Sequence, residues 1–308
     1  MNNEDLYRLI HNIEKVILGK SEEVRLLVVG VLTNGHILIE DTPGTGKTML
    51  ALALAKSVGG QFKRIQATPD LLPSDITGGF IYNPKSGEFD FRQGPVFANI
   101  LLVDEINRTT PRTQSALLEC MQEYKVTIDG RTFLLPQVFT VIATQNPIEY
   151  QGTYPLPEAQ IDRFLMKIKM GYILPEEEIR VISGQKQKHP IENLSPVIDL
   201  EKVQQLQEQV KKVEVSDKVL DYIVKLVSAT RRKEGIKLGA SPRASIAVMK
   251  ACSAWALIEG RDYVIPDDVT KLLPYILKHR LVLNPKAIIS GLTTDQVVAS
   301  LIRTITVP

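Results

Sequence analysis

The chain has 308 residues, of which 44% are hydrophobic and 23% charged, and these values are typical of globular domains. Two ordinary domains are expected at this length, with no apolar run near the roughly 18 residues of a membrane span. The net charge of +2, without a block of like charges, argues against a dedicated nucleic-acid binder. Cys120 and Cys252 lie among apolar helical residues, and no secretory signal opens the chain, so a reducing cytoplasm is the expected location.

Two helices are predicted at the start of the chain. Apolar residues recur at helical spacing over residues 6–17, and a second helix is predicted over residues 22–33. The turn that contains Ile17, Leu18 and Gly19 suits an apolar slot for adenine, and it equally suits a plain interhelical turn.

The sequence DTPGTGKT, residues 41–48, lies between an apolar strand and a helix that starts near Met49. Glycines in such a P-loop let consecutive backbone N–H groups close around phosphate oxygens at a helix N-terminus. Lys47 is expected to reach the β and γ phosphates, and the Thr48 hydroxyl to bind Mg²⁺. Asp41 departs from the usual pattern, which has glycine there. The predicted nucleotide-binding residues of the loop are Pro43, Gly44, Thr45, Gly46, Lys47, Thr48 and Met49.

The stretch ATPDLLPSDITGGF, residues 67–80, is rich in proline, aspartate and glycine. This composition predicts irregular structure over most of its length, and residues 90–95 are expected to continue it. Loops of this length usually serve a function, but the sequence does not say which.

The next predicted strand, residues 99–103, is an unbroken apolar row that ends in Asp104 and Glu105. Two carboxylates at the end of a buried strand are costly unless they face a crevice that holds a cation. Ligands of open α/β sheets bind at that edge, so the P-loop and the carboxylates explain each other. Asp104 is expected to hold Mg²⁺, and Glu105 to orient or deprotonate the water that attacks the γ phosphate.

A helix that starts at Pro111 is followed by two short strands around Asp129 and Gly130, the strongest short hairpin signal. This hairpin, residues 126–134, is expected to contact a neighbour or a substrate. A further strand, residues 139–143, leads to Asn146, whose neutral amide could hydrogen-bond the γ phosphate or the attacking water. An asparagine that serves only the turn before Pro147 is equally supported.

From about residue 174 the pattern becomes helical, with apolar residues three or four apart. We therefore expect an α/β P-loop core over residues 1–173, with a parallel sheet flanked by helices, and a small all-helical lid over residues 174–308. Helices are predicted over residues 200–213, 217–231, 242–259, 267–278 and 292–305. Arg243 falls in the first turn of the third of these, and Trp255 is expected in the core of the lid.

Four stretches occur in a characteristic order: EDTPGTGKT, ILLVDEINRTTPRTQSALLECMQEYKVTIDG, TQNPIEYQGTYPLPEAQIDRF and GASPRAS. Together they resemble the MoxR family of AAA+ ATPases over nearly the whole chain. The resemblance implies an Mg²⁺-dependent ATPase that works as a homo-oligomeric ring, a hexamer, with nucleotide between subunits. It also implies that Asn146 is the first sensor, Arg163 an arginine finger that reaches the neighbour's ATP, and Arg243 the second sensor. Whether Arg243 acts within its own subunit stays open.

The leading hypothesis is ATP hydrolysis coupled to remodelling or maturation of a client protein. The resemblance implies chaperone-like work, commonly on partners with a von Willebrand factor A domain and sometimes with metal insertion. A second hypothesis, a nucleic-acid motor or loader, is favoured only by the hairpin and opposed by the near-neutral charge. A third, a nucleotide-gated scaffold, does not explain why the hydrolytic residues Lys47, Asp104, Glu105 and Arg163 are all present.

Overall fold

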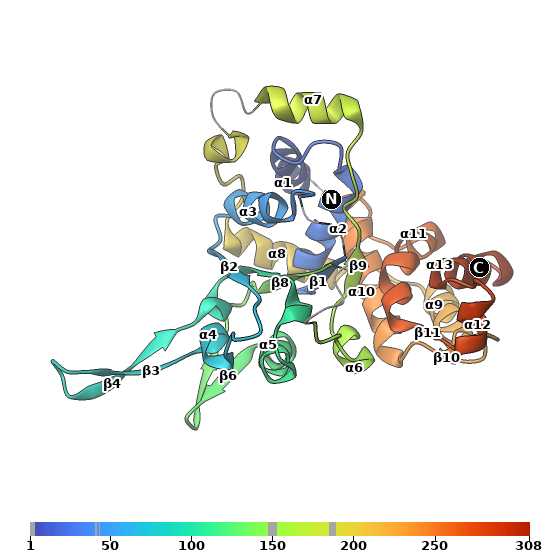
Figure 1. Cartoon of the computed structure of the whole chain (residues 1–308). Helices are drawn as coiled ribbons and strands as arrows, with labels where there is room; N and C mark the ends of the chain where they lie inside the picture. Colours follow the sequence, from blue (N-terminus) through green and yellow to red (C-terminus); the bar gives the residue numbers. More distant parts are fainter. Residues whose placement is uncertain (1–3, 41, 43, 147–152, 185–188) are drawn as a thin grey trace.

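Five short strands form a parallel sheet at the centre of the protein (Figure 1). The computed structural model describes residues 4–40, 42, 44–146, 153–184 and 189–308. In order across the sheet, the strands are β2 (Phe62–Gln66), β5 (Ile100–Asp104), β8 (Thr140–Gln145), β1 (Ile37–Glu40) and β9 (Met166–Ile168). Every neighbouring pair is parallel, so the carboxyl ends of the strands meet at one edge of the sheet.

Helices cover both faces of the sheet, because alternate strand residues point to opposite sides. Ile37 and Ile39 pack with α1 (Glu4–Glu14), α2 (Ser21–Leu32) and α3 (Lys47–Ser57). Leu38 packs on the other face with α5 (Pro111–Glu123). The first helix ends at Glu14, earlier than predicted, because the chain tightens into turns up to Gly19, which has a φ of +68°.

The prediction of irregular structure over residues 67–80 and 90–95 is largely wrong. A short helix, α4 (Pro73–Thr77), leads into β3 (Gly78–Asn83), which pairs antiparallel with β4 (Glu88–Gln93). Cross-strand aromatic pairs, Phe80 with Phe91 and Tyr82 with Phe89, stabilise this hairpin. The glycines at its base serve close backbone approach, since a Cβ at Gly78 would lie 2.2 Å from the Arg92 carbonyl oxygen.

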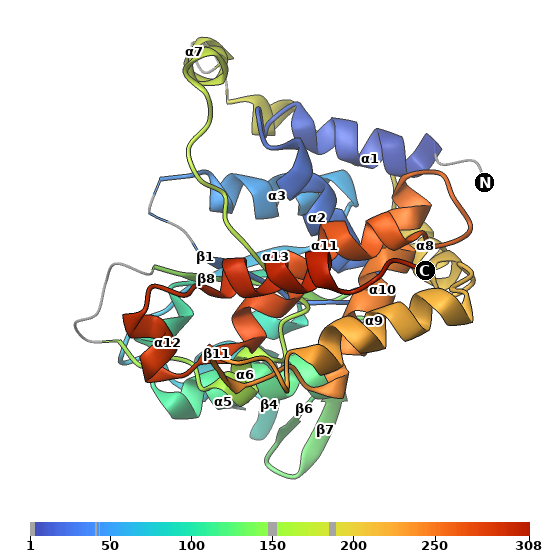
Figure 2. The same ribbon diagram turned by 90° about the vertical axis from the view of Figure 1, so that its right-hand side faces the viewer.

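The predicted second hairpin is present as β6 (Lys125–Ile128) and β7 (Arg131–Leu134). Phe133 of this hairpin stacks on Phe91 of the first, with ring centroids 4.0 Å apart, and Arg131 lies over the Phe80 ring. Both hairpins project from the same end of the molecule (Figures 1 and 2). Short elements complete the core: η1 (Pro95–Phe97), η2 (Ile106–Arg108) and α6 (Glu158–Ile161).

The C-terminal part is helical, as predicted, with one addition. A small antiparallel ribbon joins β10 (Ile236–Leu238) and β11 (Val282–Leu283). Its helices are α7 (Pro175–Gly184), η3 (Pro190–Asn193), α8 (Leu200–Val210), α9 (Asp217–Ala229), α10 (Pro242–Ile258), α11 (Pro266–Leu277), η4 (Lys278–Arg280), α12 (Pro285–Ile289) and α13 (Thr294–Thr304). Polar side chains cap the N-termini of several of these helices. At the start of α8, for example, the Asp199 carboxylate accepts a hydrogen bond from the Lys202 N–H at 2.8 Å.

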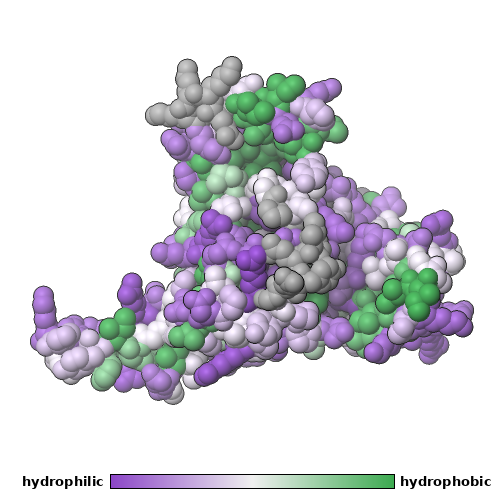
Figure 3. Space-filling view, viewed as in Figure 1, coloured by the Kyte–Doolittle hydropathy of each residue, from purple (hydrophilic) through white to green (hydrophobic). Residues whose placement is uncertain are grey.

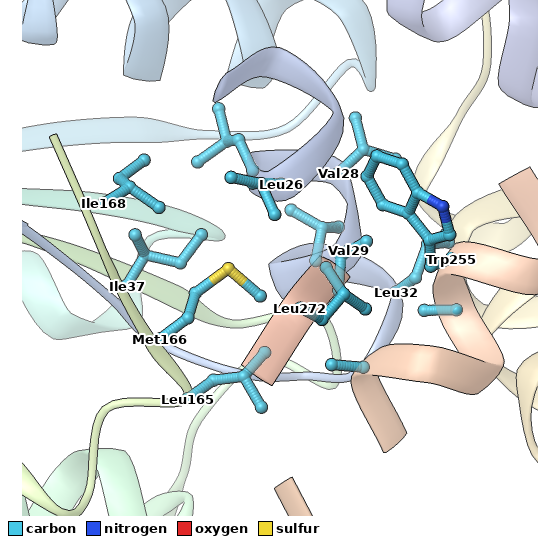
Figure 4. Close-up of a cluster of buried hydrophobic side chains, with 14 of the residues drawn as sticks. Leu26, Val28, Val29, Leu32, Ile37, Leu165, Met166, Ile168, Trp255 and Leu272 are labelled. Carbon is cyan, nitrogen blue, oxygen red and sulfur yellow. The ribbon is translucent and has the colours of Figure 1, made fainter. Parts of the chain in front are cut away.

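The lid and the core share one continuous hydrophobic cluster. Trp255 of α10 is 3% exposed and lies where the lid meets α2, close to Val28 and Val29 (Figure 4). The lid therefore packs on one side of the sheet, while α7 lies apart, beyond α1 and α3 (Figures 1 and 2). Hydrophobic side chains gather on the surface of α7 (Figure 3), where Ile179 and Ile182 are exposed. Over the described ranges, no helix is long and apolar enough to cross a membrane.

Candidate active site

The P-loop occupies the sharp connection between β1 and α3, at the carboxyl edge of the sheet. Gly44 and Gly46 both have a φ of +86°, which favours glycine, and a Cβ at either position would meet only open space. The start of α3 thus presents uncovered backbone to the cleft. The Lys47 ammonium donates to the Thr42 carbonyl oxygen at 2.7 Å. Asp41 and Pro43, also part of the predicted loop, lie outside the described residues.

The two predicted carboxylates stand where β5 ends. Asp104 is the last residue of the strand and is 7% exposed. Glu105 has a φ of +57°, an uncommon conformation for a residue other than glycine, and it caps η2. Its backbone N–H donates to the Thr144 hydroxyl of β8 at 2.9 Å, which ties the turn to the neighbouring strand. Such strained backbone is often found at functional sites.

Side chains from β2 and η2 hold both carboxylates. The Arg64 guanidinium donates to Asp104 Oδ2 at 2.7 Å. Glu105 Oε2 accepts from Gln66 Nε2 at 3.1 Å and pairs with Arg108 Nε at 3.0 Å. Arg64 and Gln66 were not predicted, because β2 and β5 become neighbours only in the folded sheet, where Gln66 lies in register with Asp104.

A cleft of about 240 Å³ brings most of the predicted site residues together. Asn146, 7% exposed, lines it directly after the end of β8. Of the predicted residues, the cleft is lined by Gly44, Thr45, Gly46, Lys47, Thr48, Met49, Asp104, Glu105 and Asn146. Its lining also includes four residues that were not assigned to it: Arg64, Gln66, Thr144 and Gln145.

The oxygen ligands and the N–H groups in the cleft fit Mg²⁺ and a polyphosphate, respectively. Thr48 and Asp104 supply oxygen atoms to the same cleft, and Mg²⁺ prefers oxygen ligands. The open cradle at Gly44 and Gly46 leaves the backbone accessible, and the Lys47 ammonium lies beside it. Chemically, this arrangement can bind phosphate oxygens next to a carboxylate, Glu105, that can accept a proton.

The predicted adenine residues do not line this cleft. Ile17 is buried, Leu18 half-buried and Gly19 exposed. Their turn contacts the segment that leads into α7, where the Lys20 ammonium donates to the Tyr172 carbonyl oxygen at 3.1 Å. A Cβ at Gly19 would lie 3.1 Å from Glu177 Cγ.

The two predicted arginines also lie outside the cleft. Arg163 follows α6, and its guanidinium donates to the Leu118 carbonyl oxygen of α5 at 2.7 Å. It lines a separate hollow of about 250 Å³ beside α5. Arg243 is exposed in the first turn of α10. Neither guanidinium lines the P-loop cleft.

Comparisons with known proteins show the class to which this chain belongs. Residues 36–166 match the ATPase family associated with various cellular activities (AAA), and residues 228–301 match the AAA lid domain. A crystal structure from Cytophaga hutchinsonii, of a chain assigned as an ATPase, is 40% identical, with a TM-score of 0.92 over 99% of this chain and 96% of that one. The chain is therefore an AAA+ ATPase.

The curated relatives narrow this class. Chaperone MoxR1 of Mycobacterium tuberculosis is 45% identical over 98% of this chain and 82% of its own length. Protein MoxR of Methylorubrum extorquens is 30% identical over 98% of this chain and 94% of its own length. The protein YeaC of Bacillus subtilis is 52% identical over 99% of this chain and 97% of its own length. The chain belongs to the MoxR family.

Proposed function

We propose that this ATPase works as a homo-oligomeric ring whose active sites are each shared by two subunits. The observation that carries the proposal is the separation of the site into two parts on one chain. The P-loop and the carboxylates share one cleft, whereas Arg163 and Arg243 lie outside it. An arginine that stabilises phosphoryl transfer must contact the transferring phosphate, so these guanidinium groups need a neighbouring subunit's cleft.

Within the cleft we assign the following roles. Lys47 and the P-loop amides bind the phosphates, and Glu105 takes a proton from, or orients, the attacking water. Asn146 hydrogen-bonds the γ phosphate or that water. Thr48 and Asp104 would hold Mg²⁺, which neutralises phosphate charge when bound. We place the adenine base at Ile17, Leu18 and Gly19.

Arg163 and Arg243 form what we call the arginine face. The two are linked through their chain neighbours, because the Ser241 hydroxyl donates to Asp162 Oδ2 at 3.1 Å. Ser241 is the N-cap residue of the helix that carries Arg243, and Asp162 precedes Arg163. We propose that both arginines act in trans, on the nucleotide of the next subunit in a hexamer.

The work that ATP hydrolysis drives is proposed to be chaperone-like remodelling of a client protein. MoxR1, a relative, is named a chaperone. We propose a client with a von Willebrand factor A domain, as the resemblance implies, and contact with it through the two hairpins. The near-neutral net charge makes nucleic acid a poor partner. A reducing cytoplasm suits the buried free thiols of Cys120 and Cys252.

The test measures ATP turnover against protein concentration, with light scattering for mass. Specific activity should rise as rings form. The Arg163→Ala variant should assemble without hydrolysing ATP, and it should regain turnover when it is mixed with Glu105→Gln subunits, since each supplies what the other lacks. A monomer that hydrolyses ATP equally well at every concentration, or a mixture without recovery, would refute the shared site.

A further inference from the structure

A buried arginine of the lid, Arg280, forms an ion pair and several hydrogen bonds with the segment that carries Arg163. Arg280 lies in η4, after α11, and is 7% exposed. Its guanidinium pairs with Asp162 Oδ1 at 2.7 Å, across 118 positions of sequence. It also donates to the carbonyl oxygens of Asp162 at 3.2 Å, Phe164 at 2.6 Å and Leu165 at 3.1 Å. The residues that it contacts therefore lie on both sides of Arg163.

Burial makes this contact rigid. A buried guanidinium is costly unless its donors find acceptors, so Arg280 depends on these carbonyl oxygens and on the Asp162 carboxylate. The Ile276 carbonyl oxygen of α11 accepts a further hydrogen bond, at 2.5 Å, which fixes the guanidinium to the lid. Movement of the 162–165 segment without the lid would leave the charge unpaired.

The second oxygen of Asp162 extends the link to Arg243. Asp162 Oδ2 accepts from Ser241 at the start of α10, two residues before Arg243. One carboxylate thus joins three parts of the chain: η4, the start of α10 and the segment after α6. Both arginines of the arginine face are attached to this carboxylate through at most two residues of backbone.

We propose that Asp162 and Arg280 are positioning residues that hold Arg163 and Arg243 as one rigid unit. This inference rests on the proposed function, because it concerns arginines that act on a neighbour's nucleotide. Neither residue touches that nucleotide. The ion pair sets where the two guanidinium groups stand, and it makes the Arg163 segment follow any movement of the lid.

The first variant to test is Asp162→Asn, which keeps the shape of the side chain and removes its charge. Turnover at saturating ATP should fall by about 10- to 100-fold, because a misplacement of about 1 Å can cost that much. The KM for ATP should change less than twofold, since the variant's own cleft is intact. Arg280→Ala serves less well, because it removes the whole buried guanidinium and can prevent folding.

A matched control exists within the lid. Asp268 is buried, and Arg261 donates to both of its carboxylate oxygens, at 2.8 and 2.7 Å, and the side-chain hydrogen bonds of this pair within the described chain all lie in the lid. Asp268→Asn should destabilise the lid to a similar extent and leave turnover at saturating ATP within about twofold of the wild type.

Mixing with Glu105→Gln subunits separates positioning from folding. Those subunits have an intact arginine face and an inactive cleft, whereas Asp162→Asn subunits have an active cleft and misplaced arginines. Mixed rings should regain turnover, because some clefts then face native arginines. Ser241→Ala, which breaks only the link to α10, should show a smaller fall and the same recovery.

The outcomes distinguish this inference from the proposed function. If the Arg163→Ala mixture recovers and the Asp162→Asn mixture does not, or if Asp268→Asn loses as much turnover as Asp162→Asn, the positioning role is wrong while the shared site stands. If the Arg163→Ala mixture itself fails to recover, the shared site is wrong and the positioning role falls with it.

Discussion

The phosphate cleft and the arginine face handle charge in opposite ways. In the cleft, cations and carboxylates compensate each other: Arg64 pairs with Asp104, and Arg108 with Glu105. On the arginine face, by contrast, neither Arg163 nor Arg243 has an ion-pair partner within the described part of the chain. The arginine face therefore carries positive charge that no carboxylate of the described chain neutralises, as the proposed shared site requires.

The largest effect is expected at Arg163. Arg163→Ala should lower kcat by about 10³- to 10⁵-fold, the range in which arginine fingers contribute. The dissociation constant for ATP in the isolated subunit should stay unchanged, because Arg163 does not line that subunit's cleft. Single-turnover rates and nucleotide titrations measure the two quantities. A matching loss of ATP affinity in the monomer would break the separation.

Glu105→Gln changes the other half of the site. The rate of hydrolysis should fall by about 10²- to 10⁴-fold, the usual contribution of a general base, while ATP still binds. The amide can keep one hydrogen bond to Gln66 or Arg108, so the turn after β5 should keep its shape. Normal turnover in this variant, measured by phosphate release, would remove Glu105 from its assigned role.

A third region lies at the amino edge of the sheet, opposite the P-loop edge. It should contribute to the stability of the fold and not to the phosphate cleft or the arginine face. His36 is buried at the start of β1, where Nδ1 accepts from the Val141 N–H at 3.0 Å and Nε2 donates to the Met121 carbonyl oxygen at 2.9 Å. Burial lowers the pKa of His36 from 6.5 to about 4. Below pH 6.5 the His36 imidazole is therefore protonated in the unfolded chain, whereas in the folded chain it stays neutral down to about pH 4.

The free energy of unfolding should consequently decrease as the pH drops from 6.5 to about 4. At pH 5 the expected loss from His36 is about 2 kcal/mol relative to pH 8. Burial, reinforced by Arg280, also lowers the pKa of His279 well below its ordinary value, so this histidine acts in the same direction. Urea unfolding at the two pH values tests the prediction. His36→Gln should reduce the pH dependence of unfolding, and an unchanged slope would contradict the assignment.

The smallest effect is expected at the proposed adenine slot. Leu18→Ala should raise the KM for ATP by roughly tenfold, the effect of about 1.4 kcal/mol of lost apolar contact. Turnover at saturation should not change, because the phosphate contacts are intact. Leu238→Ala, at an exposed position of the lid, is the control. An unaltered KM for Leu18→Ala would leave these residues as a plain interhelical turn.

Several elements show why some of the fold was predictable. The P-loop, the β5 carboxylates and the β6–β7 hairpin are each encoded within a few consecutive residues, and all appear where expected. The β3–β4 hairpin was missed because proline and glycine dominate the stretch before it. The alternation in EFDFR, residues 88–92, was the available signal, and the Phe80 and Phe91 contact that supports it forms only on pairing.

The nucleotide chemistry of this protein can be predicted from the sequence alone, because a P-loop and a strand-end carboxylate pair are local patterns whose geometry follows from one strand and one turn. The contacts of Gln66 and Arg64 with those carboxylates follow only from the folded structure, since β2 and β5 are neighbours in space and not in sequence. The contact between Arg280 and the segment around Arg163 likewise follows only from the folded structure. A contact across 118 residues leaves no local pattern, because it exists only once the lid has packed on the core.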